Sequence, residues 1–502
     1  MNKTTEILNL YHQLCNKVKE YKILERIYEF IWFWDSNTYL PPKGYIQRGD
    51  ELGALKREIK RKITHPDFEN LLNQTISNES YSTLNKKQKR NINLIKRRFE
   101  MEKRFSSDLE NRINKQIAKA TAAWKMARDA NDYSLYEPEL NKLIKLHQEK
   151  ARSIDASRDP LEVLMERFDY GISVDTLCYI FETLKSVLIP VVAKLPVSKS
   201  PKVFCSKDTQ ERILEDLADR VGHDLSAGRI DETRHPFAAG HRNDVRIAVV
   251  YDEENLLRVL FAGLHEMGHA IYEQNLNAED IYQPIGEEAG AGFHESQSRF
   301  LENFIGRSRS FWRYYLPFLK SFSIDSIANL DSEAMYEIIN RVSPSKNRIQ
   351  ADELTYSLHV IIRYELERDL LLGNITTSEL PMVWNESYSK YLGVEIQNDN
   401  EGVLQDITWA IGGFGVFPGY VLGNCFAAQM FDKMKKDIPD FDNQVENGNL
   451  KIVISWLNEN VHKQGYSYDP LELIEIITKK KFDPHYFIQY LQQKYVDLFN
   501  DL

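Results

Sequence analysis

The chain has 502 residues and a formal net charge of −10, and 42% of its residues are hydrophobic. This composition is typical of a globular protein with a sizeable core, and the acidic excess argues against a nucleic-acid-binding surface. No apolar run approaches the about 20 residues that cross a bilayer, and the polar first residues do not form a signal peptide. The four cysteines are widely separated, which fits neither a disulfide framework nor a metal cluster. We therefore expect a cytoplasmic protein with no nucleic-acid or membrane partner.

Helical periodicity recurs along the whole chain, and no Pro-, Gly- or Ser-rich linker divides it. We therefore predict a single, mainly α-helical domain over residues 1–502. Long charged helices with narrow apolar stripes follow the first helical segment up to about residue 155. Such helices pack through the stripe and expose the rest, which favours an N-terminal helical layer at about 1–155 over one wall of a cleft. The rest of the body would lie at about 156–502.

Residues 244–251 depart from this helical pattern. Their β-branched residues are concentrated in a short run, with a polar loop before it and Asp252 directly after. A strand is the best prediction for such a run. It would lie immediately before the next helical segment.

That segment reads Phe-Ala-Gly-Leu-His-Glu-Met-Gly-His-Ala-Ile-Tyr over residues 261–272. Its apolar residues repeat at spacings of three and four, which predicts a helix. His265 and His269 then lie one turn apart on one face, where both imidazoles can converge on one ion. Glu266 points beside the ion and can accept a proton from a water there. A solvated helix face with two histidines and a glutamate would, by itself, give the same pattern.

A third candidate ligand stands on the next amphipathic segment, residues 292–301. Glu295 lies 26 residues after His269 and completes a set of two histidines and one glutamate. Such a set leaves a fourth position open for water, as in zinc peptidases. In a peptidase, an edge strand at 244–251 would pair with an extended peptide by backbone hydrogen bonds. An ordinary small hairpin explains that run equally well.

Two residues further along are candidates for substrate contacts. Arg348 lies in a loop that leads into a predicted helix at 355–371, and its guanidinium fork can hold a substrate's terminal carboxylate. Tyr420 follows a glycine-rich stretch, and its hydroxyl can stabilise a developing oxyanion. A surface arginine and a buried loop between helices are the alternative interpretations.

Several motifs in order resemble those of the carboxypeptidase Taq family of metallocarboxypeptidases, over nearly the whole chain. They are the segment from Trp34-Asp35 to Pro42, His235-Pro-Phe237, His265-Glu-Met-Gly-His269, His294-Glu-Ser-Gln297, Arg348-Ile-Gln-Ala-Asp352 and Gly402-Val-Leu-Gln405-Asp406. The resemblance implies a helical fold with a deep active-site groove, a small β-sheet beside the metal helix and an N-terminal helical layer.

The resemblance also implies a cytoplasmic homodimer that uses Zn²⁺ or Co²⁺ to release single amino acids from peptides with a free C-terminal carboxylate. The implied metal ligands are His265, His269 and Glu295, with Glu266 as the general base. Tyr420 would assist the oxyanion and Arg348 would hold the carboxylate. Further substrate-binding residues would be His235, Arg246, Gln405 and Asp406.

Two positions depart from the family's pattern. Ala248 stands where the motif Asp-x-Arg-x-Thr has threonine, and Thr408 stands where Gly-x-x-Gln-Asp-x-His-Trp has histidine. Loss of one donor to the transition state can cost on the order of ten- to a thousandfold in rate. Because the metal set and the base are intact, we expect slower or altered catalysis, and the two departures leave a weakly active or inactive peptide-binding relative as one alternative. An endo-acting or dipeptide-releasing oligopeptidase is the other, since related helical, deep-groove zinc peptidases share the metal motif.

Overall fold

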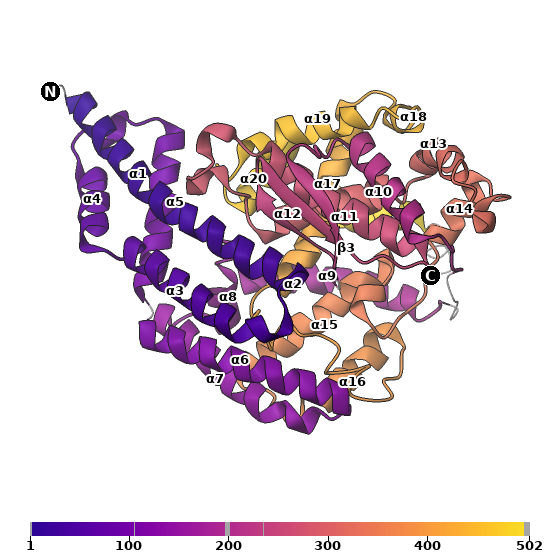
Figure 1. Ribbon diagram of the computed structural model, residues 1–502, viewed down its shortest axis with the longest axis horizontal. Helices are drawn as coiled ribbons and strands as arrows, with labels where there is room; N and C mark the ends of the chain where they lie inside the picture. The colour runs from indigo at the N-terminus through magenta and orange to yellow at the C-terminus, as the bar shows by residue number, and fades with distance from the viewer. Residues whose placement is uncertain (1–2, 105, 196–200, 234, 496–502) are drawn as a thin grey trace.

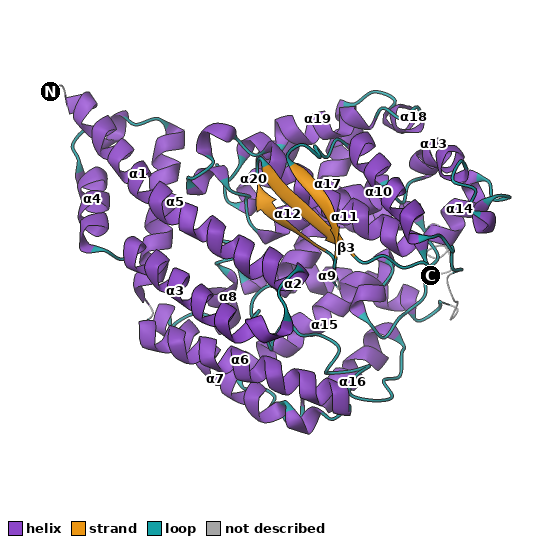
Figure 2. Cartoon of the chain, in the orientation of Figure 1, coloured by secondary structure: helices purple, strands orange, loops and turns teal. Residues whose placement is uncertain are grey.

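The computed structural model describes residues 3–104, 106–195, 201–233 and 235–495. Helices dominate these residues, and one small sheet lies among them (Figure 2). The mainly α fold class predicted from the sequence is therefore confirmed. None of the described helices combines the length and apolar character needed to cross a bilayer.

Helices from the first part of the chain cover one side of the molecule. In Figure 1 the indigo and violet helices α1, α3, α4 and α5 lie on the left, and α6 and α7 run along the lower edge. On α5 the buried Ile92, Ile95 and Phe99 follow the helical period, whereas most of the lysines and arginines stay partly or fully exposed. The helices are α1 (Lys3–Glu29), the π-helix η1 (Phe30–Asp35), α2 (Ser36–Thr38), α3 (Tyr45–Ile63), α4 (Pro66–Ser77), α5 (Lys86–Arg104), α6 (Ser107–Ala130) and α7 (Glu137–Ile154).

The remaining helices form the body, with α11, α12, α15 and α17 at its centre (Figure 1). The predicted metal helix and the helix after Arg348 are α11 and α15. The body contains α8 (Pro160–Met165), α9 (Val174–Val192), α10 (Lys207–Val221), α11 (Leu256–Asn275), α12 (Ala291–Arg299), the π-helix η7 (Phe300–Ile305), α13 (Arg309–Lys320), α14 (Ser332–Ile339), α15 (Glu353–Leu372), α16 (Leu380–Leu392), α17 (Phe417–Asp437), α18 (Phe441–Glu446), α19 (Leu450–Asn460), α20 (Pro470–Thr478) and α21 (His485–Lys494).

The described strands are β1 (Gly228–Glu232), β2 (Phe237–His241) and β3 (Asp244–Val249), in the order β1-β3-β2. β3 pairs in parallel with β1 and antiparallel with β2, and it packs against α11. The predicted strand is thus confirmed, but its position at an edge was wrong, because β3 is central. β2 lies at an edge instead. Its Phe-Ala-Ala-Gly-His sequence lacks the β-branched residues that reveal a strand.

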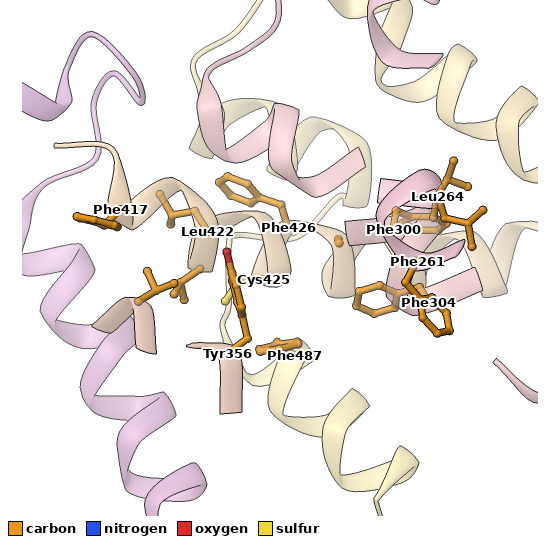
Figure 3. Close-up of a cluster of buried hydrophobic side chains, with 14 of the residues drawn as sticks. Phe261, Leu264, Phe300, Phe304, Tyr356, Phe417, Leu422, Cys425, Phe426 and Phe487 are labelled. Atoms are coloured by element: carbon orange, nitrogen blue, oxygen red, sulfur yellow. The ribbon is translucent and has the colours of Figure 1, made fainter. Parts of the chain in front are cut away.

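Two main hydrophobic clusters hold the helices together, besides a small third one between η1 and the sheet. The larger one extends through the body and includes side chains of α6 and α7. Figure 3 shows part of it, where Phe261 and Leu264 of α11 lie beside Phe300 and Phe304 of η7. The smaller one joins α1, α3, α4 and α5 around Leu14 and its neighbours. The division of the chain near residue 155 stays a prediction, since α6 and α7 contribute to the larger cluster.

Leu14→Ala is expected to destabilise the smaller cluster by about 2–5 kcal/mol, because Leu14 is fully buried and its truncation leaves a cavity. Leu372→Ala is the control, since Leu372 is 43% exposed. Urea denaturation followed by circular dichroism would measure both. Equal midpoints for the two variants would contradict the packing role of Leu14.

Candidate metal centre

A cavity of about 2360 Å³ lies between the N-terminal helices and the body. α1 and η1 line one wall, and α11, α12 and the loops before α15 and α17 line the other. We interpret this cavity as the predicted groove. It brings together residues that the sequence analysis selected from widely separated segments, namely His235, His265, Glu266, His269, Glu295, Arg348, Gln405, Asp406 and Tyr420.

The three candidate metal ligands meet in this groove. One donor atom from each of His265, His269 and Glu295 lies within 4.8 Å of the others. The Oε2 atom of Glu295 lies 3.9 Å from Nε2 of His265 and 3.6 Å from Nε2 of His269. Donors about 2.0–2.1 Å from a tetrahedral ion lie about 3.4 Å apart, so this set fits a divalent metal with small adjustments.

The charge states of His269 and Glu295 also suit a metal. Burial lowers the pKa of His269 to about 3, which keeps its imidazole neutral. Burial alone would raise the pKa of Glu295, but the Arg299 guanidinium and the two imidazoles hold it well below its usual range. The carboxylate is therefore ionised, and its second oxygen, Oε1, accepts a hydrogen bond of 2.7 Å from Nε of Arg299.

Glu302, on the π-helix η7, orients His265. Its Oε2 lies 2.9 Å from Nδ1 of His265 and accepts a hydrogen bond of 3.1 Å from Nη1 of Arg299. The ionised carboxylate accepts from Nδ1–H, which turns Nε2 towards the other donors. The sequence analysis did not identify Glu302. Its spacing of seven residues from Glu295, with Arg299 between them, was the available signal.

Glycines allow the three helices of the centre to approach closely. A Cβ on Gly268 of α11 would lie 2.5 Å from the backbone of Gln297 and Ser298 on α12. A Cβ on Gly423 of α17 would lie 2.6 Å from Cγ of Glu295. Any larger side chain at these positions would push α12 away, so both glycines determine where Glu295 stands.

Glu266 lies next to the donors on α11 and lines the groove. It is 6% exposed, and burial raises its pKa to about 7. A carboxyl with a raised pKa beside a metal set is suited to accept and return protons near neutral pH.

A second histidine pair ties the metal helix to the sheet. The imidazole of His294 stacks on His269 with ring centroids 4.3 Å apart, and its Nε2 lies 3.3 Å from Oε1 of Glu273. The other oxygen of Glu273 lies 2.6 Å from Nδ1 of His241 at the end of β2. This chain of contacts fixes the edge strand β2 beside the metal site.

Arg348 lies on the same wall of the groove as the metal ligands, in a cluster with the other selected residues. Its Nε and Nη2 atoms lie 3.3 Å and 3.2 Å from Oδ2 of Asp406, and its backbone N–H donates to Oε1 of Gln405 at 3.3 Å. Its guanidinium lies 5.2 Å from the ring centre of Tyr420. Burial lowers the pKa of His235, and the positive charge of Arg348 lowers it further. The four residues around Arg348 thus belong to one site.

Arg246 and the two departures occupy different places. Arg246 pairs with Asp244 and stacks over Phe30 at 4.2 Å, so it holds η1 on the sheet and is absent from the groove lining. Ala248 is fully buried in a small cluster between η1 and the sheet. Thr408 lines the groove and donates its hydroxyl to Oδ1 of Asp406 at 2.5 Å.

The model of the carboxypeptidase Taq (M32) metallopeptidase family matches residues 13–495 of this chain. Carboxypeptidase 1 of Bacillus subtilis is 35% identical and covers 95% of this chain and 98% of its own length. The crystal structure of an M32 carboxypeptidase from Deinococcus radiodurans superimposes with a TM-score of 0.92 at 31% identity, over 98% of this chain and all of that one. Metallocarboxypeptidase 1 of Trypanosoma cruzi gives a TM-score of 0.91 at 32% identity, over 97% and 99% of the two chains. As its motifs predicted, the chain therefore belongs to the carboxypeptidase Taq (M32) family of metallopeptidases and is a peptide-hydrolysing enzyme.

Proposed function

We propose that the protein is a zinc-dependent carboxypeptidase that releases single amino acids from the free carboxyl ends of peptides. The observation that carries the proposal is a series of side-chain contacts that connects the metal ligands to Arg348. Arg299, the partner of Glu295, stacks over Tyr356 at 4.0 Å, and the Tyr356 hydroxyl accepts from Nη1 of Arg348 at 3.4 Å. A metal set and a carboxylate-binding cation are thus held at a fixed separation.

The metal ligands in this proposal are His265, His269 and Glu295. Zn²⁺ suits their two nitrogens and one oxygen, and the family resemblance also admits Co²⁺. When bound, the ion supplies Lewis-acid polarisation of the scissile carbonyl and lowers the pKa of a water in the site. Glu266 accepts a proton from that water and passes it to the leaving amine.

The other residues position the peptide. Arg348 binds the terminal carboxylate, so that the metal reaches the last peptide bond and not an internal one. Tyr420 places its hydroxyl near the developing oxyanion; its pKa is raised, chiefly by burial, so the hydroxyl stays protonated and can donate. His235, Gln405 and Asp406 complete the substrate site, and the edge strand β2 offers backbone groups to the extended peptide. The resemblance supports a homodimeric, cytoplasmic enzyme.

Hydrolysis of blocked dipeptides and their carboxyl-amidated twins, by metal-free protein with Zn²⁺ or Co²⁺ added back, tests this proposal. We expect release of the terminal amino acid from the free-carboxylate set alone, and only with metal. Cleavage of both sets would indicate an endo-acting or dipeptide-releasing oligopeptidase. Tight metal binding without cleavage of either set would indicate a peptide-binding relative that is weakly active or inactive.

Glu266→Gln is expected to lower kcat at least about 100-fold while metal content stays unchanged, because glutamine keeps the shape of the side chain and cannot accept the proton. Atomic absorption and turnover of a blocked dipeptide would be measured on the same sample. Glu279→Gln, at an exposed residue, controls for the loss of one negative charge. Full activity of Glu266→Gln would remove Glu266 from the role of base.

Gly423→Ala is expected to weaken zinc affinity about 10- to 100-fold, because the added methyl group displaces Glu295. Competition with a chelator would measure the affinity. Gly49→Ala is the matched control, since a Cβ on Gly49 meets no atom within 4 Å. Equal zinc affinity in both variants would show that Glu295 does not act as a ligand from this position.

A further inference from the structure

Arg348 shares its acidic partner with a second arginine. Arg363, on α15, is 1% exposed, and its Nε donates to Oδ2 of Asp406 at 2.9 Å. Its Nη2 donates to Oε1 of Gln405 at 2.8 Å, and its Nη1 donates to the backbone carbonyl of His359 at 2.9 Å. The guanidinium of Arg363 therefore donates to groups within the protein. It holds Gln405 and Asp406, the neighbours of Arg348, in place.

The two carboxylate oxygens of Asp406 bind different partners. Oδ2 serves both guanidinium groups, those of Arg348 and Arg363. Oδ1 accepts from Thr408 twice, from the backbone N–H at 3.0 Å and from the hydroxyl at 2.5 Å. The Thr408 side chain is itself confined, because its methyl group packs on Gly413, where a Cβ would lie only 2.7 Å away. Thr408 thus keeps one oxygen of Asp406 away from Arg348.

Because Oδ1 of Asp406 is bonded to Thr408, Arg348 forms only a weak ion pair with the remaining oxygen, Oδ2. Elsewhere in the protein, Arg97 meets both oxygens of Asp469 at 2.7 Å and 3.0 Å in a fork pair. Arg348 instead meets one oxygen of Asp406 at 3.2–3.3 Å. Within the group of Arg348, Arg363 and Asp406 there is also one more positive charge than negative. Because a buried cation gains most from a fully formed pair, Arg348 is left able to bind a second carboxylate.

We propose that Thr408 is a specificity-determining residue, which holds Asp406 to a single oxygen and so reserves Arg348 for the terminal carboxylate of the peptide. The inference rests on the proposed carboxypeptidase function. Without the Thr408 hydroxyl, Oδ1 of Asp406 keeps only the backbone N–H of Thr408 as a partner. The less restrained carboxylate can then turn about its side-chain axis and offer both oxygens to Arg348. The fork pair that forms competes with the substrate. Thr408 is a positioning residue in this scheme, since it acts through Asp406 and Arg348.

The test compares Thr408→Val with Thr408→Ser. Valine has nearly the shape of threonine but lacks the hydroxyl, whereas serine keeps the hydroxyl and loses the methyl group. For a blocked dipeptide with a free carboxylate, we expect Thr408→Val to raise KM about tenfold or more, with a smaller change in kcat, because a hydrogen bond to a charged group is lost. Thr408→Ser is expected to restore most of the affinity.

Two controls isolate the effect. Thr377 donates its hydroxyl to Glu137 and is absent from the groove lining, so Thr377→Val removes a similar hydrogen bond and is expected to leave KM unchanged. Calorimetry would measure binding of the same free and amidated peptides to Glu266→Gln protein, with and without Thr408→Val. Because Glu266→Gln protein is expected not to turn the peptides over, this experiment measures affinity alone. The expected result is weaker binding of the free peptide alone.

The outcomes separate the inference from the proposed function. If the parent protein releases amino acids from free-carboxylate peptides and Thr408→Val retains the parent KM, the role of Thr408 is overturned and the carboxypeptidase stands. If Thr408→Val weakens the free and the amidated peptide equally, the role is also overturned, because the effect does not pass through the carboxylate. If the parent cleaves both sets of peptides alike, the proposed function falls and the inference falls with it.

Discussion

The close approach of α12 to both α11 and α17 is the constraint on which the site depends. Glu295 can reach the two histidines of α11 only because Gly268 and Gly423 bring the helix backbones together. The metal set is therefore a product of helix packing as much as of the residues that carry the donors. The buried aromatic side chains of α11 and η7 pack together and stabilise this arrangement of helices (Figure 3).

Positive and negative charges alternate from the metal set to the cluster around Arg348. Glu295 pairs with Arg299, and Asp406 pairs with Arg348 and Arg363, while Tyr356 joins the two groups. Burying any one of these charges without its neighbour would cost several kcal/mol. Since all of them lie in helices or loops of the body, the network holds the metal set and the cluster around Arg348 at a fixed separation.

Those parts of the site that depend on local spacing could be predicted from the sequence. His265 and His269 share a helix face at any tertiary arrangement, and the spacing to Glu295 favoured a third ligand. Glu302 and Arg363 were missed, because their roles arise from contacts across the fold. Arg363 is a charged residue on an otherwise apolar stretch of α15, which was the available signal. β2 was missed because Gly and Ala have little strand propensity, and their backbone pairing depends on β3.

The same distinction applies to Thr408, which departs from the family's motif in the sequence and, in the proposed function, positions Asp406 in the structure. A motif comparison records only that the family's histidine has been replaced. In the fold, the Thr408 hydroxyl and backbone N–H satisfy the one oxygen of Asp406 that faces away from the arginines. In the proposed function, specificity for a terminal carboxylate requires a cation that is held in place and yet not fully paired. A short hydroxyl side chain meets that requirement, because it restrains the acid without adding charge.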